Sequence, residues 1–117
     1  MRLVKQKCVA CRVGSPRVTP EEVAEFRPQV PDWAITQADG IDRLERTFRF
    51  GDFAAALEFA NKVGGLAEEE DHHPMLVVEW GRVRVVWWTH KIKGLHRNDF
   101  VMAAKTDEAF KTLPGSA

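Results

Sequence analysis

The chain has no excess of charge of either sign, few cysteines and no long apolar run, and each absence excludes a class of protein. Lys and Arg together number 17, as do Asp and Glu, so bulk charge does not attach this protein to nucleic acid. Two cysteines are too few for a disulfide-rich secreted scaffold. No apolar stretch approaches the roughly 18 residues of a membrane span, and the first twenty residues lack the apolar core of a signal peptide. We therefore expect a soluble, cytoplasmic protein without a membrane or direct nucleic-acid partner.

The composition is that of a folded domain. Hydrophobic residues make up 44% of the 117 residues and charged residues 29%, which argues against a disordered, charge-rich chain. The length suits one domain that can bury a sizeable core. The first residues show no sustained periodicity, and Gly14-Ser15-Pro16 is a turn signal. We expect a poorly structured lead-in over residues 1–18 and a single domain over 19–114.

The first half of the domain has clear helix and turn signals. Thr19 can cap a helix, Pro20 suits its first position, and Glu22 completes a capping box. Alternating apolar and polar residues then predict an antiparallel hairpin with one solvated face. Its expected parts are a strand at Trp33–Thr36, a turn at Asp39-Gly40 and a strand at Arg43–Phe50.

The second half repeats this order. Asp52 can cap a helix from Phe53 to about Val63, which Gly64-Gly65 should end. Two apolar, β-branched runs follow as a second hairpin, and a last helix closes the domain. These expected parts are Met75–Trp80, a pivot at Gly81, Arg82–Thr89, and a helix from Asn98 or Asp99 through Phe110. The order helix, hairpin, helix, hairpin, helix predicts an α+β fold, with a four-stranded antiparallel sheet and helices packed on one face.

Three of the four histidines fall at one end of the second hairpin. His72 and His73 lie between the acidic run 68–71 and a strand, and Pro74 restricts His73 to an extended backbone. In a hairpin centred on Gly81, His90 lies near the same open end. With Glu68 just before and Asp99 at a nearby helix start, these residues form a candidate acid/base site, because imidazole both donates and accepts protons near neutral pH.

Two other interpretations of the histidines stay open on residues alone. Three His and a carboxylate are also a metal-ligand set, although this spacing is not one that makes zinc sites recognisable. The histidines could equally be surface polar residues. Cys8-x-x-Cys11 is half a zinc site without a second pair, and it lacks the context of a redox motif. It assigns no chemistry by itself.

The spacing of the site residues resembles the active-site signature of the pterin-4a-carbinolamine dehydratases. The matching residues are Glu68, His72-His73-Pro74, Trp80, Thr89-His90, Gly94-Leu95 and Asp99. The start of the chain, Lys7-Cys8-x-x-Cys11-Arg12, is similar to the lead-in of many bacterial members. One departure is His96, where members commonly have Ser or Thr. We expect that position to be a helix N-cap, so the change should bear on capping more than on chemistry.

The resemblance implies a hydro-lyase that dehydrates 4a-hydroxytetrahydropterin to quinonoid dihydropterin and water, in the recycling of tetrahydrobiopterin. It implies no metal, nucleotide or covalent intermediate, and therefore no cofactor. His72 and His90 would be the acid/base pair, and His73 would chiefly hold the pterin. Glu68 and Asp99 would orient imidazoles or bond the pterin edge. Trp80 would stack on substrate or pack in the core.

The resemblance also bears on partners. The family forms dimers and, in some members, tetramers, so we expect a homodimer or homotetramer, with a functional link to an aromatic amino acid hydroxylase. The alternative is a non-catalytic binding module, since relatives of this fold stabilise the dimerisation of a homeodomain transcription factor or resemble Rubisco assembly factors. A non-enzymatic member is expected to lack one or more of the three histidines. Here all three are present, with Asp99.

Overall fold

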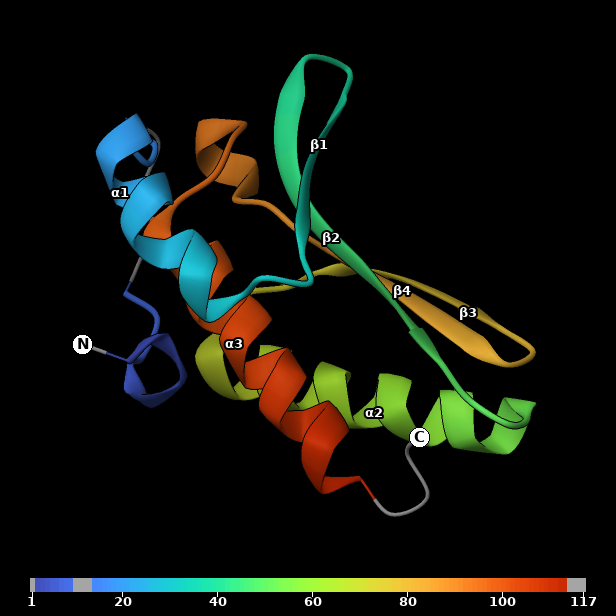
Figure 1. Cartoon of the computed structure of the whole chain (residues 1–117). Helices are drawn as coiled ribbons and strands as arrows, with labels where there is room; N and C mark the ends of the chain where they lie inside the picture. Colours follow the sequence, from blue (N-terminus) through green and yellow to red (C-terminus); the bar gives the residue numbers. More distant parts are fainter. Residues whose placement is uncertain (1, 10–13, 114–117) are drawn as a thin grey trace.

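The computed structural model describes residues 2–9 and 14–113, arranged as one sheet and its covering helices (Figure 1). The α-helices are α1 Pro20–Phe26, α2 Phe53–Glu70 and α3 Arg97–Thr112. The strands are β1 Ala34–Ala38, β2 Ile41–Arg49, β3 Met75–Glu79 and β4 Arg82–Trp87. Short 3-10 helices lie at Leu3–Lys5, Arg27–Gln29 and His90–Ile92. Within the described residues, no helix combines the length and apolar character needed to cross a membrane.

The sheet joins the two hairpins through their inner strands. Its order is β1-β2-β4-β3, and all neighbouring strands are antiparallel. α2 and α3 lie on the same face of the sheet (Figure 1). The first hairpin turns at Asp39 and Gly40, with φ of 54° and 74°, the two positive values that a tight two-residue hairpin turn requires. The predicted α+β class and element order are confirmed.

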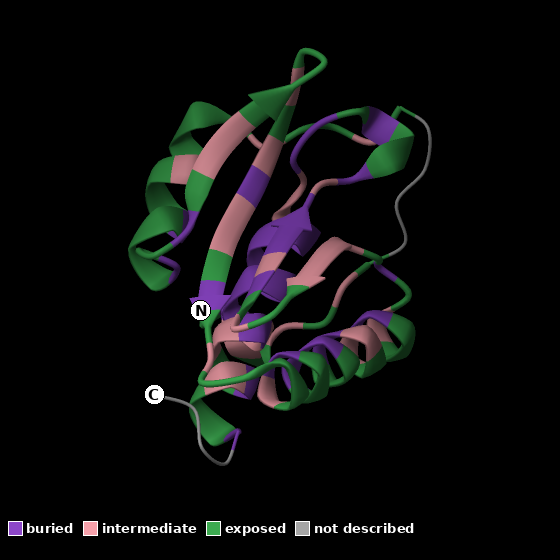
Figure 2. Ribbon diagram, turned by 90° about the vertical axis from the view of Figure 1, so that its right-hand side faces the viewer, coloured by how far each residue is buried: buried purple, intermediate pink, exposed green. Residues whose placement is uncertain are grey.

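The core lies between the sheet and the two long helices (Figure 2). Leu44 and Phe48 of β2 and Val85 of β4 are at most 1% exposed, as the alternation of side chains across a strand requires. The Phe48 ring centroid lies 4.7 Å from that of Phe59 on α2 and 5.0 Å from that of Phe110 on α3. These contacts fix both helices against the sheet and so fix the helix ends that carry the site.

The predicted end of the second helix at Gly64-Gly65 is wrong, because α2 continues to Glu70. The apolar stripe extends past the glycines through Ala67, which is 1% exposed. Tertiary burial of this stripe outweighs the low helix propensity of two glycines. The helix ends instead at Asp71, whose left-handed backbone (φ 51°) turns its N–H back onto the carbonyls of Ala67 and Glu68. The chain therefore leaves α2 directly before His72.

Replacing Gly64 or Gly65 by alanine should stabilise the fold. A Cβ at either position would meet no atom within 4 Å, and neither backbone has a positive φ. We expect each change to raise the free energy of unfolding by about 0.5–1 kcal/mol, because alanine loses less backbone freedom in a helix. Urea unfolding measures the gain. Gly81→Ala is the opposite control, since Gly81 has a φ of 78° and its Cβ would lie 3.3 Å from the Phe50 carbonyl oxygen. Loss of stability in both helix variants would contradict the interpretation.

The start of the chain packs against the domain, so the expected poorly structured lead-in is wrong for residues 2–9. Leu3 is 0% exposed and belongs to the core. Its N–H donates to Gln29 Oε1 at 2.7 Å, and Lys105 Nζ donates to the Val4 carbonyl at 3.0 Å. Cys11 and residue 114, the end of the expected domain, lie outside the described residues.

Candidate active site

A pocket of about 470 Å³ lies at the open end of the β3–β4 hairpin. His72, His73 and His90, the three histidines that the sequence groups together, all line it. The sheet register explains their meeting. Because Met75 pairs with Val86, the residues just before β3 and just after β4 lie at one end of the sheet. The hairpin thus brings histidines that are far apart in the sequence to one pocket.

Local structure fixes the two segments that carry the histidines, one just before β3 and one just after β4. The left-handed Asp71 ends α2, and the following residues lead directly into β3. On the other side, β4 ends at Trp87, two residues before the expected end at Thr89, and His90 begins a 3-10 turn. A bridge between Thr89 and Gly94 closes this turn, with the Thr89 N–H 2.9 Å from the Gly94 carbonyl oxygen.

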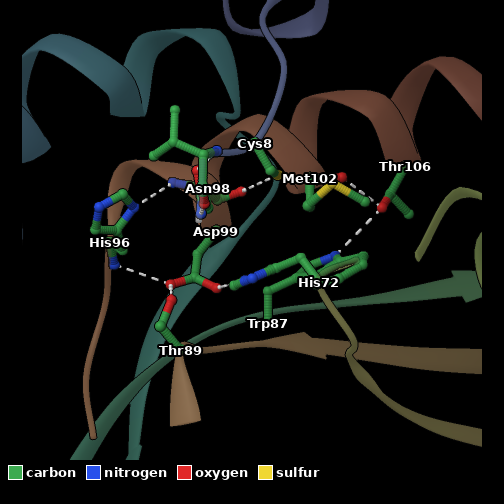
Figure 3. Close-up of polar contacts among 10 residues, drawn as sticks. Cys8, His72, Trp87, Thr89, His96, Asn98, Asp99, Met102 and Thr106 are labelled. Carbon is green, nitrogen blue, oxygen red and sulfur yellow. Dashed lines mark hydrogen bonds and ion pairs between the residues drawn. The ribbon is translucent and has the colours of Figure 1, made fainter. Parts of the chain in front are cut away.

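His72 is held by the most buried polar group of the site, the carboxylate of Asp99. His72 is 9% exposed and Asp99 0%. His72 Nε2 lies 2.7 Å from Asp99 Oδ1, while the Thr89 hydroxyl and the His96 N–H donate to Asp99 Oδ2 at 2.8 and 2.9 Å (Figure 3). Since a carboxylate only accepts, this contact places a proton on His72 Nε2 and leaves Nδ1 as the nitrogen that can exchange one.

A second contact, with an aromatic ring, also fixes the ring of His72. It stacks on Trp87, with centroids 5.9 Å apart and an interplanar angle of 14°. Trp87 in turn donates from Nε1 to the Thr106 hydroxyl at 3.2 Å (Figure 3). Stacking and the Asp99 contact together allow this imidazole one orientation.

His73 and Glu68 form a second imidazole–carboxylate pair in a different environment. His73 Nε2 lies 2.5 Å from Glu68 Oε2, and the two side chains are 53% and 79% exposed. An exposed pair contributes little to stability because water screens it. Its effect is to orient the His73 ring at the mouth of the pocket, where it is open to a ligand.

His90 belongs to a short stack with Trp88 and Arg43. Its ring centroid lies 4.4 Å from that of Trp88, which also lines the pocket. The Arg43 guanidinium of β2 covers the Trp88 ring at 4.0 Å. The sequence indicates that Trp87 and Trp88 point to opposite faces of the strand, and in the structure Trp87 is 0% exposed in the core while Trp88 lines the pocket. Arg43 lies on another strand, and no sequence pattern near the histidines points to it.

Trp80 does not join these residues. It lies in the turn of the β3–β4 hairpin, at the opposite end of the strands from the histidines, and is 72% exposed. Neither a core role nor stacking in this pocket fits that position. The expectation rested on the family resemblance, whereas the pivot at Gly81 already places Trp80 at the turn end of the hairpin, away from the histidines.

Three further residues line the pocket, and the sequence by itself assigned none of them a role in the site. Cys8 and Val9 border the pocket from the start of the chain, and Thr89 borders it between Trp88 and His90. The Thr89 hydroxyl bonds Asp99, so its polar character has a structural reason. Cys8 could have been suspected only from its place in a motif, because it lies more than sixty residues from the histidines.

His96 caps α3, as its position predicts, and the helix begins at Arg97, one residue earlier than expected. His96 Nδ1 accepts from the Asn98 N–H at 3.0 Å, and Asp99 completes a capping box through the His96 N–H. Burial lowers the pKa of His96 below its ordinary value, with the nearby Asp99 opposing the shift. The cap needs the neutral ring, because a protonated Nδ1 cannot accept.

The cap makes stability depend on pH. The lowered pKa means that the unfolded chain takes up a proton before the folded chain does. The contribution of His96 is therefore complete above about pH 6.5 and is lost as pH falls from there toward the folded-state pKa. We expect the parent protein to lose more stability between pH 8 and pH 5 than His96→Ser, which keeps a capping oxygen without a titrating ring. Urea unfolding at both pH values measures this, and equal losses would contradict it.

The chemistry that this arrangement supports is proton transfer. Three imidazoles border one pocket, one buried against a carboxylate, one exposed beside a carboxylate and one beside an indole. Among residues 2–9 and 14–113, no three His, Cys, Asp or Glu side chains are grouped as a metal ion would require. Paired imidazoles in unlike surroundings can divide the roles of acid and base.

Comparisons with known proteins point to one family. The family model described as pterin 4 alpha carbinolamine dehydratase matches residues 16–109. A protein of Syntrophotalea carbinolica named "Putative pterin-4-alpha-carbinolamine dehydratase" is 64% identical over 91% of this chain and 95% of its own. The crystal structure of a transcriptional coactivator/pterin dehydratase from Brucella melitensis has a TM-score of 0.70 and 32% identity, covering 80% of this chain and 98% of that one.

A fourth similarity concerns the fold alone. A pterin dehydratase-like protein identified as a RuBisCO assembly factor in the alpha-carboxysome aligns with a TM-score of 0.57 at 23% identity, over 74% of this chain and 93% of its own. At that identity the two proteins share an architecture, and nothing about activity follows.

Proposed function

The chain belongs to the pterin-4-alpha-carbinolamine dehydratase family, a family of hydro-lyases, and on this premise we propose that it dehydrates a 4a-hydroxytetrahydropterin by histidine acid/base catalysis. The products are quinonoid dihydropterin and water. The observation that carries the proposal is the lining of one pocket by three imidazoles, two of which bond carboxylates.

The reaction needs two proton transfers. The C4a hydroxyl must gain a proton to leave as water, and N5 must lose one as the C4a–N5 double bond forms. One protonated and one neutral imidazole meet both needs, since the acid gives up a proton and the base takes one. The protons balance over the cycle once solvent resets the pair, and no covalent intermediate is required.

His72 and His90 form the acid/base pair in this proposal. His72 uses Nε2 for Asp99, so Nδ1 is its working nitrogen. His90 borders the same pocket and is exposed, so it can exchange protons with solvent between turnovers. Asp99 is a positioning residue, because it acts through His72.

His73 and Glu68 hold the substrate. A pterin is planar, carries little net charge and has donors and acceptors around its edge. An exposed imidazole beside a carboxylate offers both kinds of group at the mouth of the pocket. Such a ligand needs local hydrogen bonds rather than a net field, which agrees with a chain whose formal charge is zero.

The proposal extends to partners. β1 and β3 are edge strands, and Phe53 and Leu57 of α2 are 44% and 43% exposed, so both edges and one helix carry surface that a second copy could cover. We therefore expect a homodimer or homotetramer. From the family resemblance we further expect the protein to act in the cytoplasm, on the product of an aromatic amino acid hydroxylase. A monomer in sedimentation at micromolar concentration would contradict the oligomer.

The direct test is the dehydration rate of freshly generated 4a-hydroxytetrahydrobiopterin. Acceleration over the spontaneous reaction by the folded protein supports the proposal. A folded protein without acceleration would favour the non-catalytic binding module instead. Retention of all three histidines and Asp99 favours catalysis in advance of that result.

A further inference from the structure

One wall of the histidine pocket comes from the start of the chain. Cys8 and Val9 line the pocket together with the three histidines. Both precede residue 16, where the match to the family begins. Along the chain they lie more than sixty residues before His72, so only the tertiary structure brings them there. We call residues Cys8 and Val9 the N-terminal wall.

The N-terminal wall is fastened by two side chains. The Asn98 carboxamide makes a reciprocal pair with Val9, accepting from its N–H at 3.0 Å and donating to its carbonyl at 2.7 Å. Glu70 Oε1 accepts from the Cys8 N–H at 2.9 Å. Asn98 is 1% exposed, so its bonds to the wall are shielded from water. Backbone groups of the wall are thereby satisfied without a ligand.

The two fasteners belong to the elements that also position the catalytic histidines. Asn98 is adjacent to Asp99 at the start of α3, and Figure 3 shows both beside His96 and Cys8. Glu70 is the last residue of α2 and lies just before His72. The wall is therefore held in register with His72 by the same two helix ends. Displacement of the wall need not move the imidazoles, because Asp99 holds His72 separately.

The surface that the wall offers is suited to the flat part of a ligand. Its amides are engaged by Asn98 and Glu70, while Val9 leaves 49% of its surface exposed. An apolar side chain and a thiol beside a polar pocket favour van der Waals contact and exclusion of water over hydrogen bonding. The polar edge of a pterin is already provided for by His73 and Glu68 in the proposed function.

We infer that the N-terminal wall packs against the bound pterin and that Asn98 is the positioning residue that holds it there. The inference rests on the proposed function, because it assigns a wall to the same substrate. It gives the first residues of the chain a part in substrate affinity, separate from proton transfer. A wall of this kind should act on KM and leave kcat nearly unchanged, since the acid/base pair stays in place.

Asn98→Ala tests the fastening. It removes both bonds to Val9, and we expect KM to rise roughly tenfold with kcat within about twofold of the parent. Glu70→Ala should raise KM by a smaller factor. Glu70→Gln keeps an acceptor for the Cys8 N–H, so its KM should be close to that of the parent. Glu69→Ala is the matched control, because it removes an exposed carboxylate from the same turn. An unchanged KM in both Asn98→Ala and Glu70→Ala would overturn the inference.

A chemical measurement covers the case in which Asn98→Ala fails to fold. In Cys11→Ser, Cys8 is the only thiol of the chain. We expect 7,8-dihydrobiopterin at saturating concentration to slow the alkylation of Cys8 by N-ethylmaleimide roughly fivefold or more, because the bound pterin covers the wall and access controls thiol reactivity. Equal rates with and without this pterin, in a protein that turns over the hydroxypterin, would overturn the inference alone. A parent protein without turnover would remove the proposed function and this inference with it.

Discussion

His90→Ala should lower kcat roughly 10²- to 10⁴-fold while the protein stays folded. His90 is exposed and contributes its ring to the pocket rather than to the core, so truncation leaves no buried cavity. The loss is that of one partner of the proposed acid/base pair. Dehydration of 4a-hydroxytetrahydrobiopterin, followed beside circular dichroism, measures both quantities.

The controls for this result come from the other histidines. His96→Ser removes an imidazole that caps α3 and does not line the pocket, so its kcat should match that of the parent. His72→Ala should also lose most turnover, but it removes a buried ring stacked on Trp87, so its stability must be measured alongside. A fully active His90→Ala would exclude His90 from catalysis. A His96→Ser as inactive as His90→Ala would show that the loss does not depend on the pocket.

Asp99→Asn should give the second large effect, because turnover should fall roughly 100-fold or more in a protein that stays folded. The amide keeps one oxygen for the Thr89 hydroxyl and the His96 N–H, but it turns an NH₂ group toward His72 Nε2. His72 must then accept at Nε2 and carry its proton on Nδ1, so the working nitrogen has the wrong protonation. NMR of the His72 ring nitrogens reports the tautomer directly.

Asp99→Ala separates positioning from stability. It leaves the His72 ring, the Thr89 hydroxyl and the His96 N–H without their shared acceptor in a buried place, and we expect a loss of about 3–5 kcal/mol in urea unfolding. Asp99→Asn should lose much less stability and nearly as much turnover. Parent-like turnover in a folded Asp99→Asn would contradict the role of Asp99 as the positioning residue of His72.

The parts of the fold that the sequence predicts are those governed by neighbouring residues. The capping box of Thr19 and Glu22 is present, because both partners lie within one helical turn. The turn at Asp39-Gly40 forms where expected, since residues that tolerate positive φ are rare and conspicuous. The predicted helix end at Gly64-Gly65 is wrong because its outcome depends on what α2 packs against, which local propensity does not contain.

In the candidate site, too, the sequence predicts what neighbouring residues decide and misses what tertiary contacts decide. The pairs Glu68–His73 and His72–Asp99 join residues that the spacing already associates, and one hairpin explains how the histidines meet. The expected place of Trp80 is wrong because Trp80 adjoins the turn at Gly81, and the length of the strand pair separates that turn from the histidines at the open end. Cys8 reaches the pocket, and Arg43 reaches the ring of Trp88, from distant segments by contacts that no local pattern encodes.

By itself, then, the sequence determined the element order, the hairpin turns, the group of three histidines and the absence of net charge, because each depends on residue type and short-range spacing. The tertiary structure alone decided that His72 is buried against Asp99, that His73 stays exposed, and that Val9 is hydrogen-bonded to Asn98. Burial and long-range hydrogen bonds depend on which surfaces the packed core brings together. That packing is a property of the whole chain, and it sets the different environments through which similar imidazoles can take different roles.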